Sequence, residues 1–204
     1  MNTPFLNDVG FRGQVPFQPP RRLQNPIRSI SSTENLLKWI CQVSLSPCVR
    51  YNSWNMQTVY EAAGGLDGLL KLAHAWHKRV LADEVVAHAF SHGFRPDHTE
   101  RLAAYWAEAL GGPTTYSDKY GDETSVVRIH SGNGLHEEMD QRAIACFDQA
   151  LEDVGLAREE RLRRVLHDYF AWATTTTMAR YHHSADDVPD GLHIPKWSWD
   201  GLIS

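Results

Sequence analysis

Apolar residues recur at intervals of three and four along several stretches of the chain, which is the spacing of amphipathic helices. No segment alternates between apolar and polar residues as a half-buried strand would, and no internal repeat is visible. The pattern therefore predicts an all-α domain. The predicted helices cover residues 58–63, 66–80, 84–90, 97–110, 139–154 and 162–173.

Glycines and acidic residues mark the predicted helix ends. Asp83 and Asp97 stand where two of the helices begin, a position that favours aspartate because its carboxylate can accept backbone N–H groups. Glycines follow the ends of four helices, where a left-handed conformation lets the chain turn. These corners are Gly64-Gly65, Gly93, Gly111-Gly112-Pro113 and Gly155.

The chain divides into three regions by composition. Residues 1–55 contain six of the ten prolines and carry six basic against two acidic residues, so this region is +4 and the rest, given a net charge of −5, is −9. We interpret residues 1–55 as a disordered extension, or as the product of a start codon assigned too early, since Met56 directly precedes the first patterned segment. Residues 56–181 form the predicted helical domain. Residues 182–204, which include Trp197 and Trp199, are predicted to fold back onto its apolar surface.

Length and composition exclude several classes of protein. At 204 residues and 42% hydrophobic, the chain can bury one substantial core. We expect no membrane partner, because no apolar run approaches the roughly 18–20 residues that cross a bilayer. We expect no nucleic-acid partner, since the basic N-terminal region lacks interleaved aromatic residues. The three cysteines form no Cys-x-x-Cys pair, which favours a reducing, cytoplasmic location.

Four short motifs together resemble the group II truncated haemoglobins. They are Val59–Gly65, Asp83–Val85, Leu110–Pro113 with Thr115-Tyr116 following, and Val127–His130. A tyrosine four residues before Gly-Gly, then Leu-Gly-Gly-Pro with a tyrosine close behind, then Arg-x-His, is a specific combination in order and spacing. The resemblance runs from about Val59 to Gly155. It implies a truncated, two-over-two globin-like helical sandwich with extra N-terminal and C-terminal segments.

The resemblance also implies one haem b, with His130 as the proximal ligand of its iron. A neutral imidazole can donate one lone pair to the metal while its other nitrogen bonds a carbonyl or carboxylate. His136 is the nearest competitor, but Glu137 and Glu138 beside it suggest a position that faces solvent.

On the opposite side of the haem, Trp76-His77 falls where the family usually carries Phe-Tyr, whose hydroxyl donates to bound dioxygen. His77 can make a similar hydrogen bond, or can point to the outer face of its helix. His98 falls near a position over the distal face, from which it could donate to a ligand, bind iron as a sixth ligand, or simply be exposed. Phe90 matches an aromatic that packs against the haem, unless it is ordinary core.

Three further residues complete the predicted site. Leu102 matches an apolar distal residue and could equally be core, whereas Arg101 and Tyr116 are candidates for the haem propionates. For Arg101, an exposed arginine is the simpler alternative. The family's customary tryptophan on the next long helix is absent, with Ala143 or Ile144 in that neighbourhood. Losing this donor and the tyrosine predicts a roomier pocket.

The resemblance therefore predicts a haem protein that binds dioxygen or another diatomic ligand. Nitric oxide dioxygenation or peroxidase-like oxidation would make it a haem-dependent oxidoreductase served by an unidentified reductase. A haem-based sensor or electron-transfer protein, with His98 and His130 both on the iron, is the alternative. A helical interaction protein that has lost haem is the third possibility, and absorption spectroscopy separates the three.

Overall fold

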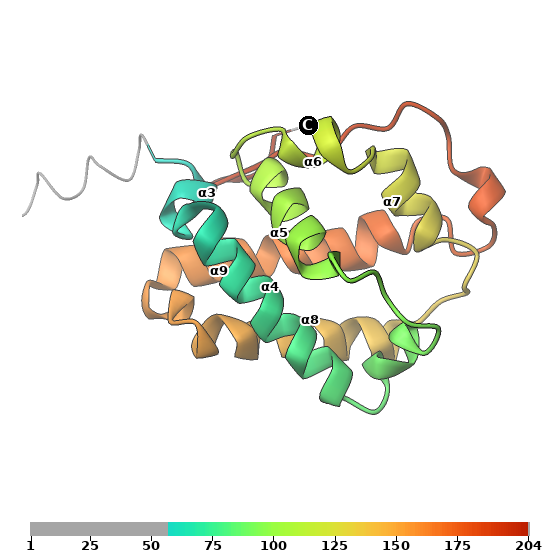
Figure 1. Cartoon of the computed structure of the whole chain (residues 1–204), viewed down its shortest axis with the longest axis horizontal. Helices are drawn as coiled ribbons and strands as arrows, with labels where there is room; N and C mark the ends of the chain where they lie inside the picture. The colour runs from blue at the N-terminus through green and yellow to red at the C-terminus, as the bar shows by residue number, and fades with distance from the viewer. Residues whose placement is uncertain (1–56, 204) are drawn as a thin grey trace, which may run out of the picture. The chain divides into compact units, whose positions relative to one another are not determined.

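The computed structural model describes residues 57–203, and these residues are helical except for one small hairpin (Figure 1). The predictions for residues 1–55 lie outside the described range. The helices in chain order are α3 (Val59–Ala62), α4 (Gly65–Ala82), η1 (Val86–Phe90), α5 (His98–Ala109), α6 (Thr115–Lys119), α7 (Glu123–Ile129), α8 (Glu137–Asp153), η2 (Leu156–Arg158), α9 (Glu160–Trp172), η3 (Ala173–Met178) and η4 (Ala185–Asp187). Strands β1 (Trp197–Ser198) and β2 (Gly201–Leu202) pair antiparallel. The all-α prediction is confirmed, with two-residue strands as the only departure within the described residues.

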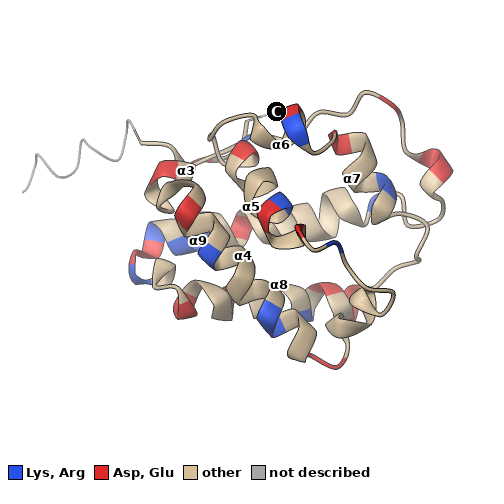
Figure 2. Ribbon diagram, in the orientation of Figure 1, with Lys and Arg blue, Asp and Glu red and all other residues tan. Residues whose placement is uncertain are grey.

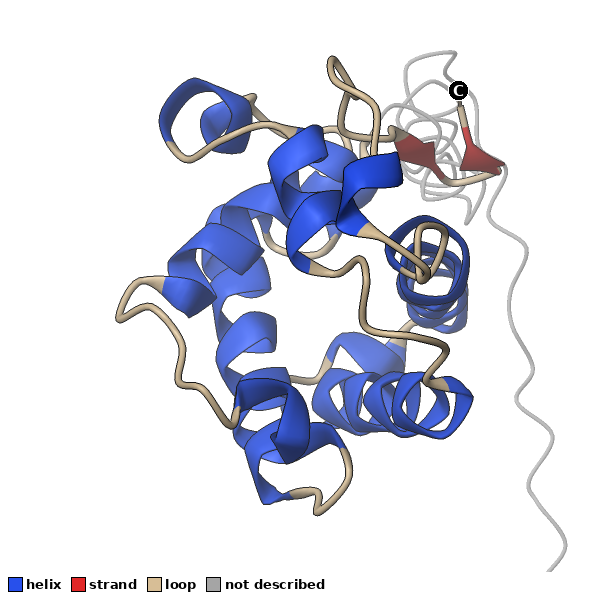
Figure 3. Cartoon of the chain, turned by 90° about the vertical axis from the view of Figure 1, so that its right-hand side faces the viewer, coloured by secondary structure: helices blue, strands red, loops and turns tan. Residues whose placement is uncertain are grey.

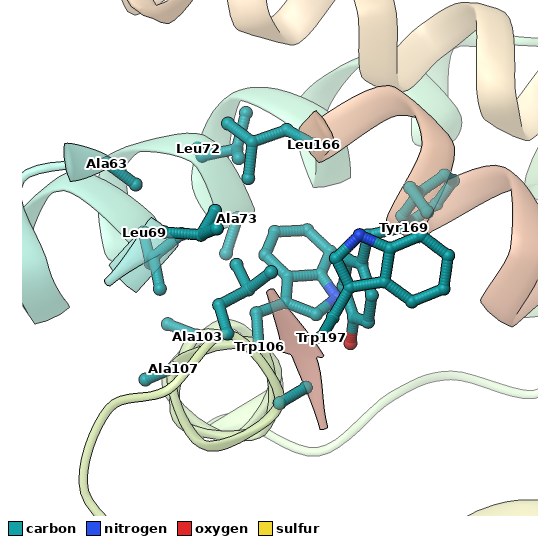
Figure 4. Close-up of a cluster of buried hydrophobic side chains, with 14 of the residues drawn as sticks. Ala63, Leu69, Leu72, Ala73, Ala103, Trp106, Ala107, Leu166, Tyr169 and Trp197 are labelled. Carbon is teal, nitrogen blue, oxygen red and sulfur yellow. The ribbon is translucent and has the colours of Figure 1, made fainter. Parts of the chain in front are cut away.

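The core lies where α4 packs against α5 and α8 and where α8 packs against α9. Figure 4 shows side chains from α4, α5 and α9 meeting around Trp106, with Trp197 of the C-terminal segment beside them. Leu69, Leu72 and Leu166 are fully buried there. The hydrophobic stripes of the sequence therefore face one another, and their burial is the main stabilising contribution.

Capping residues begin the helices much as the sequence indicates. Thr58 and Glu61 form a reciprocal capping box at α3, with Thr58 N donating to Glu61 Oε2 at 2.8 Å. Asp83 Oδ1 accepts from the N–H groups of Val85 and Val86, both at 2.9 Å. The segment that follows is a short 3₁₀ helix, η1, and not the α-helix expected over 84–90.

The surroundings of Gly112 explain why the Leu110–Pro113 motif needs a glycine at this position. A Cβ at this position would lie 2.8 Å from the ring of Tyr60 and 2.7 Å from the carbonyl oxygen of Ala107. Tyr60 N also donates to Leu110 O at 3.0 Å. The Tyr60 motif and the Gly-Gly-Pro motif are therefore in contact, and only glycine allows this close approach of α3 to the end of α5.

Acidic and basic residues are interspersed along α4, α8 and α9 (Figure 2). Arg79 of α4 forms a bidentate pair with Asp153 of α8, at 2.6 and 2.7 Å. Arg142 of α8 contacts Asp83 at 3.3 Å. These pairs link α4 and the start of η1 to α8. None of the helices within residues 57–203 combines the length and the apolar character needed to span a bilayer.

The C-terminal segment lies against the helices (Figures 1 and 3). Val188, Ile194 and Trp197 are buried, and the Trp197 ring packs on Trp172 of α9 at 5.3 Å. Lys196 Nζ donates to the carbonyl oxygen of Glu108 at 3.0 Å. The segment thus contributes apolar side chains to the same core as α5 and α9.

Candidate functional site

His130 stands at the C-terminal end of α7, a helix too short for periodicity to predict. Asp122 begins that helix by accepting Ser125 N at 2.8 Å. The Nδ1 atom of His130 lies 2.8 Å from the carbonyl oxygen of Val126, one turn back along α7. A carbonyl can only accept, so we assign the ring hydrogen to Nδ1, which leaves the lone pair on Nε2.

The surroundings of His130 combine exposure with desolvation. The residue is accessible to solvent, yet enough protein surrounds the ring that desolvation lowers the pKa of His130. A histidine with a lowered pKa is neutral at pH 7, the form that can ligate a metal. The Val126 carbonyl fixes which nitrogen is presented, as outer partners of metal-bound histidines do.

A cluster of two histidines and two phenylalanines is built by α4, η1, α5 and the loop between η1 and α5. We call His77, Phe90, Phe94 and His98 the distal cluster. The His77 ring lies 4.5 Å from the Phe94 ring, 4.9 Å from the His98 ring and 5.2 Å from the Phe90 ring, measured between centroids. His77 is on the buried face of α4, so it does not point to the outer face of the helix. The sequence did not indicate Phe94, which follows Gly93 in a loop.

Both histidines of the distal cluster have a buried nitrogen without a protein partner. The Nε2 atoms of His77 and His98 make no hydrogen bond to the described residues. Desolvation lowers the pKa of each ring, and for His98 the nearby rings of His77 and His130 lower it further. Buried polar atoms are normally hydrogen-bonded, so two unpartnered nitrogens side by side mark a position where a ligand would be stabilised.

The His130 ring, at the end of α7, contributes to lowering the pKa of His98 on α5, so the two rings lie near each other. Large apolar side chains are exposed beside them: Phe94 is 49% exposed, Ile129 77% and Leu135 62%. Apolar side chains, neutral imidazoles and a backbone-oriented His130 together fit a flat, largely apolar group that carries a metal, such as a haem.

Trp76 and Leu102 lie beside this region and within the core. The indole N–H of Trp76 donates to the carbonyl oxygen of Ala143 on α8 at 3.2 Å, and its ring lies 6.4 Å from Phe90. A large side chain from α4 thus packs over a small residue of α8. Leu102 is partly buried against the same core.

Arg101 and Tyr116, the candidates for haem propionates, lie in a separate group of side chains. Arg101 donates to Asp97 Oδ2 at 2.8 Å and to the Tyr120 carbonyl oxygen at 3.1 Å. The Tyr116 ring packs edge-on against Tyr105 at 5.3 Å. Ring contacts join His77, Phe90 and His98, whereas Arg101 and Tyr116 have the partners given above. The roles of the eight residues towards haem stay predictions.

A buried carboxylate near this second group escaped the sequence analysis. Glu123 opens α7, is 3% exposed, and accepts the Tyr105 hydroxyl at 2.8 Å. Burial raises the pKa of Glu123 to about 7. In the sequence it is simply an acidic residue in the first turn of a helix, a position that usually faces solvent, so no signal distinguished it.

The geometry defines a helical protein in which α7 presents one histidine towards two others on α4 and α5. Comparison with known proteins gives the class. The family model described as bacterial-like globin matches residues 58–175, more than half of the chain. The chain therefore belongs to the bacterial-like globin family, and its fold is that of a truncated globin.

Individual relatives agree with this assignment. A group 1 truncated haemoglobin from Tetrahymena pyriformis is 28% identical over 100 residues, covering 49% of this chain and 78% of that protein. A haemoglobin from Chloroflexus aurantiacus is 26% identical, with a TM-score of 0.53 over 61% of this chain and 99% of that one. A haemoglobin from Thermobifida fusca is 27% identical, with a TM-score of 0.51 over 60% and 97%.

The group II truncated haemoglobin from Bacillus anthracis matches in fold alone, at 19% identity with a TM-score of 0.53 over 60% of this chain and 90% of that one. The resemblance to group II is compatible with these matches. Membership of a globin family implies haem as the cofactor.

Proposed function

We propose that this globin binds haem b through Nε2 of His130 and takes up dioxygen or another diatomic ligand on the side of the distal cluster. The observation that carries the proposal is the 2.8 Å contact between His130 Nδ1 and the Val126 carbonyl oxygen at the end of α7. That contact leaves the lone pair on Nε2, and the charge of the His130 ring acts on the pKa of nearby His98. When bound, haem supplies an iron that can coordinate a diatomic ligand.

His77 is the residue best placed to act on the ligand. Its ring is buried and neutral, and its Nε2 makes no other hydrogen bond to the described residues. With its hydrogen on Nε2, the neutral imidazole of His77 would donate a hydrogen bond to a ligand that carries partial negative charge. Phe90 and Phe94 pack edge-on against this ring. A hydrogen bond to a charged acceptor is worth about 1.5–3 kcal/mol, which would slow ligand release.

Ala143 stands in the neighbourhood where the family usually carries a bulky donor, so the ligand would lack that hydrogen bond from α8, which suits reaction with peroxide or nitric oxide besides dioxygen. Turnover of either kind would need an external reductase. Among the described residues, Cys146 on α8 is a buried free cysteine. An unpaired thiol suits a reducing compartment such as the cytoplasm.

Two-histidine ligation is the second candidate, favoured by a specific observation. The charge of the His130 ring contributes to lowering the pKa of His98, whose buried Nε2 has no hydrogen-bond partner among the described residues. If His98 ligated the iron opposite His130, the protein would act as an electron carrier or a sensor.

Absorption spectroscopy tests the proposal. The protein expressed with added haem precursor should show a Soret band, and His130→Ala should lose most haem affinity. His136→Ala is the matched control, because His136 is exposed at the start of α8. A His130→Ala protein that retains the wild-type spectrum would overturn the assignment of the ligand.

The same spectra decide between the two candidates. One-histidine ligation predicts a five-coordinate ferrous spectrum without added ligand, and His77→Leu should then speed dioxygen release by about tenfold or more, the equivalent of the hydrogen bond lost. Two-histidine ligation predicts a six-coordinate spectrum that becomes five-coordinate in His98→Ala.

A further inference from the structure

Tyr105 and Glu123 form a buried hydrogen-bonded pair that the proposed haem site does not use. The Tyr105 hydroxyl donates to Glu123 Oε2 at 2.8 Å. Tyr105 is 6% exposed and Glu123 is 3% exposed. A phenol in direct contact with a carboxylate, away from water, has a defined acceptor for its proton.

Glu123 is an unusually good proton acceptor for its type. Its second oxygen, Oε1, is buried and makes no hydrogen bond to the described residues. Desolvation raises the pKa of Glu123 to about 7, and the neighbouring charge of Asp122 acts in the same direction. A carboxylate with a pKa near the working pH can both hold and release a proton.

A second buried tyrosine provides a comparison inside the same core. Tyr169 of α9 is 2% exposed, and its hydroxyl makes no hydrogen bond to the described residues. It lies close enough to Glu123 for the carboxylate charge to raise the pKa of Tyr169. Both tyrosines are therefore buried near Glu123, but only Tyr105 is hydrogen-bonded to it.

The pair joins the two helices that carry the facing histidines. Tyr105 lies seven residues after His98 on α5, which places both on the same side of that helix. Glu123 begins α7, and His130 ends it. A phenol here lies between the two elements that would enclose the haem.

The geometry points to Tyr105 as a one-electron donor to oxidised haem, with Glu123 taking its phenolic proton. The oxidant is hydrogen peroxide, which takes two electrons from the haem protein and, with two protons, becomes two molecules of water. The Tyr105 O–H bond then breaks: one electron passes to the oxidised haem group, the proton passes to Glu123 Oε2, and a neutral tyrosyl radical remains. Without the carboxylate, the electron would have to leave before the proton, which is unfavourable in a buried setting. This inference rests on the proposed haem function.

Freeze-quench electron paramagnetic resonance after mixing the ferric holoprotein with hydrogen peroxide tests the inference. Wild type should give a radical signal that narrows when the protein contains ring-deuterated tyrosine, and Tyr105→Phe should lose that signal. Tyr169→Phe is the matched control and should retain it. Glu123→Gln keeps an acceptor oxygen but removes the base, so the radical should form more slowly by about 10²-fold.

The outcomes separate the two proposals. A protein without a Soret band refutes the haem function and this inference with it. If haem binds and reacts with peroxide, but Tyr105→Phe keeps the full tyrosyl signal or Glu123→Gln forms it at the wild-type rate, only the inference is overturned. Should Tyr105→Phe fail to retain haem, Glu123→Gln and Tyr169→Phe still give opposite predicted results.

Discussion

The fold surrounds two buried carboxylates differently and shifts their pKa values in opposite directions. These are Glu108 and Glu123. Glu108, on α5, is 4% exposed and accepts from Ser117 N at 3.0 Å, from Ser117 Oγ at 2.7 Å and from Lys196 Nζ at 3.3 Å. Burial alone would raise the pKa of Glu108, but these donors bring it below its usual value. Glu123 has one donor, and burial raises its pKa to about 7.

The difference separates a carboxylate held as an ion from one held close to its neutral form. In the C-terminal segment and the core beneath it, which we call the structural region, Lys196 meets the buried charge of Glu108. Glu123 Oε1 and the Nε2 atoms of His77 and His98 are buried without hydrogen-bond partners among the described residues, and so are the Tyr169 hydroxyl and Trp197 Nε1. Unsatisfied polar groups lower stability, so each of them calls for an explanation such as a ligand or a reaction.

The largest expected effect concerns the structural region. We propose that the C-terminal segment is an integral part of the globin body, and Trp197→Ala tests this. Trp197 is 8% exposed and packs on Tyr169 and Trp172, so its truncation should lower the free energy of unfolding by about 3–5 kcal/mol.

Urea denaturation followed by circular dichroism measures that loss. Leu202→Ala, on the paired strand and 45% exposed, is the control and should change stability by less than about 0.5 kcal/mol. A similarly small effect of Trp197→Ala would show that the segment is dispensable. The C-terminal segment could then no longer be called part of the structural region.

A smaller effect is expected from the titration of Glu123. Its folded pKa, about 7, lies above the usual value of 4.5, so its stabilising contribution is complete below pH 4.5 and is lost as pH rises through 7. The loss should reach up to about 3 kcal/mol, the equivalent of the shift. Glu123→Gln should remove it, and the variant should be the more stable protein above pH 7.

The difference in unfolding free energy between wild type and Glu123→Gln, measured from pH 4.5 to 8.5, isolates this contribution. The histidines have lowered pKa values and produce the opposite slope, but they are common to both proteins. Glu137→Gln, at an exposed glutamate of α8, should show no such trend. If the difference in unfolding free energy between wild type and Glu123→Gln did not change with pH, burial would not raise the pKa of Glu123.

The sequence predicted the long helices because they depend on local signals. Hydrophobic periodicity identified α4, α5, α8 and α9, and glycines marked the ends of α5 and α8. Periodicity missed α6 and α7, since five and seven residues are too few to show a stripe. The short motifs alone pointed to His130.

What the sequence could not indicate are properties that arise from tertiary packing. Glu108 and Glu123 are both ordinary acidic residues in the sequence, and only the fold brings Lys196 to one of them and Tyr105 to the other. The partners of Arg101 within the protein, Asp97 and the Tyr120 carbonyl, likewise follow from the fold, and its role towards a propionate stays a prediction. Phe94 entered the distal cluster from a loop whose path no periodicity specifies.

The smallest expected effect is that of Lys196→Met, which leaves Glu108 with Ser117 as its remaining donor. Because Lys196 is partly exposed and Ser117 still supplies two hydrogen bonds, the loss at pH 7 should be about 1–3 kcal/mol. Asp190→Asn, at an exposed ion pair of the same segment, is the control and should have no measurable effect.

The pH dependence of the destabilisation by Lys196→Met tests whether the pKa of Glu108 is shifted in the opposite direction to that of Glu123. The folded pKa of Glu108 is lowered, so its contribution is present above its unfolded value and is lost as pH falls. The destabilisation by Lys196→Met should therefore shrink as pH falls below 4.5, the usual value for glutamate, because Glu108 takes up a proton over this range and no longer needs a cation. A loss that stays constant over the whole acidic range in which the protein remains folded would show that Lys196 acts through its apolar stem and its bond to the Glu108 carbonyl, so that the two carboxylates would differ less than their surroundings indicate.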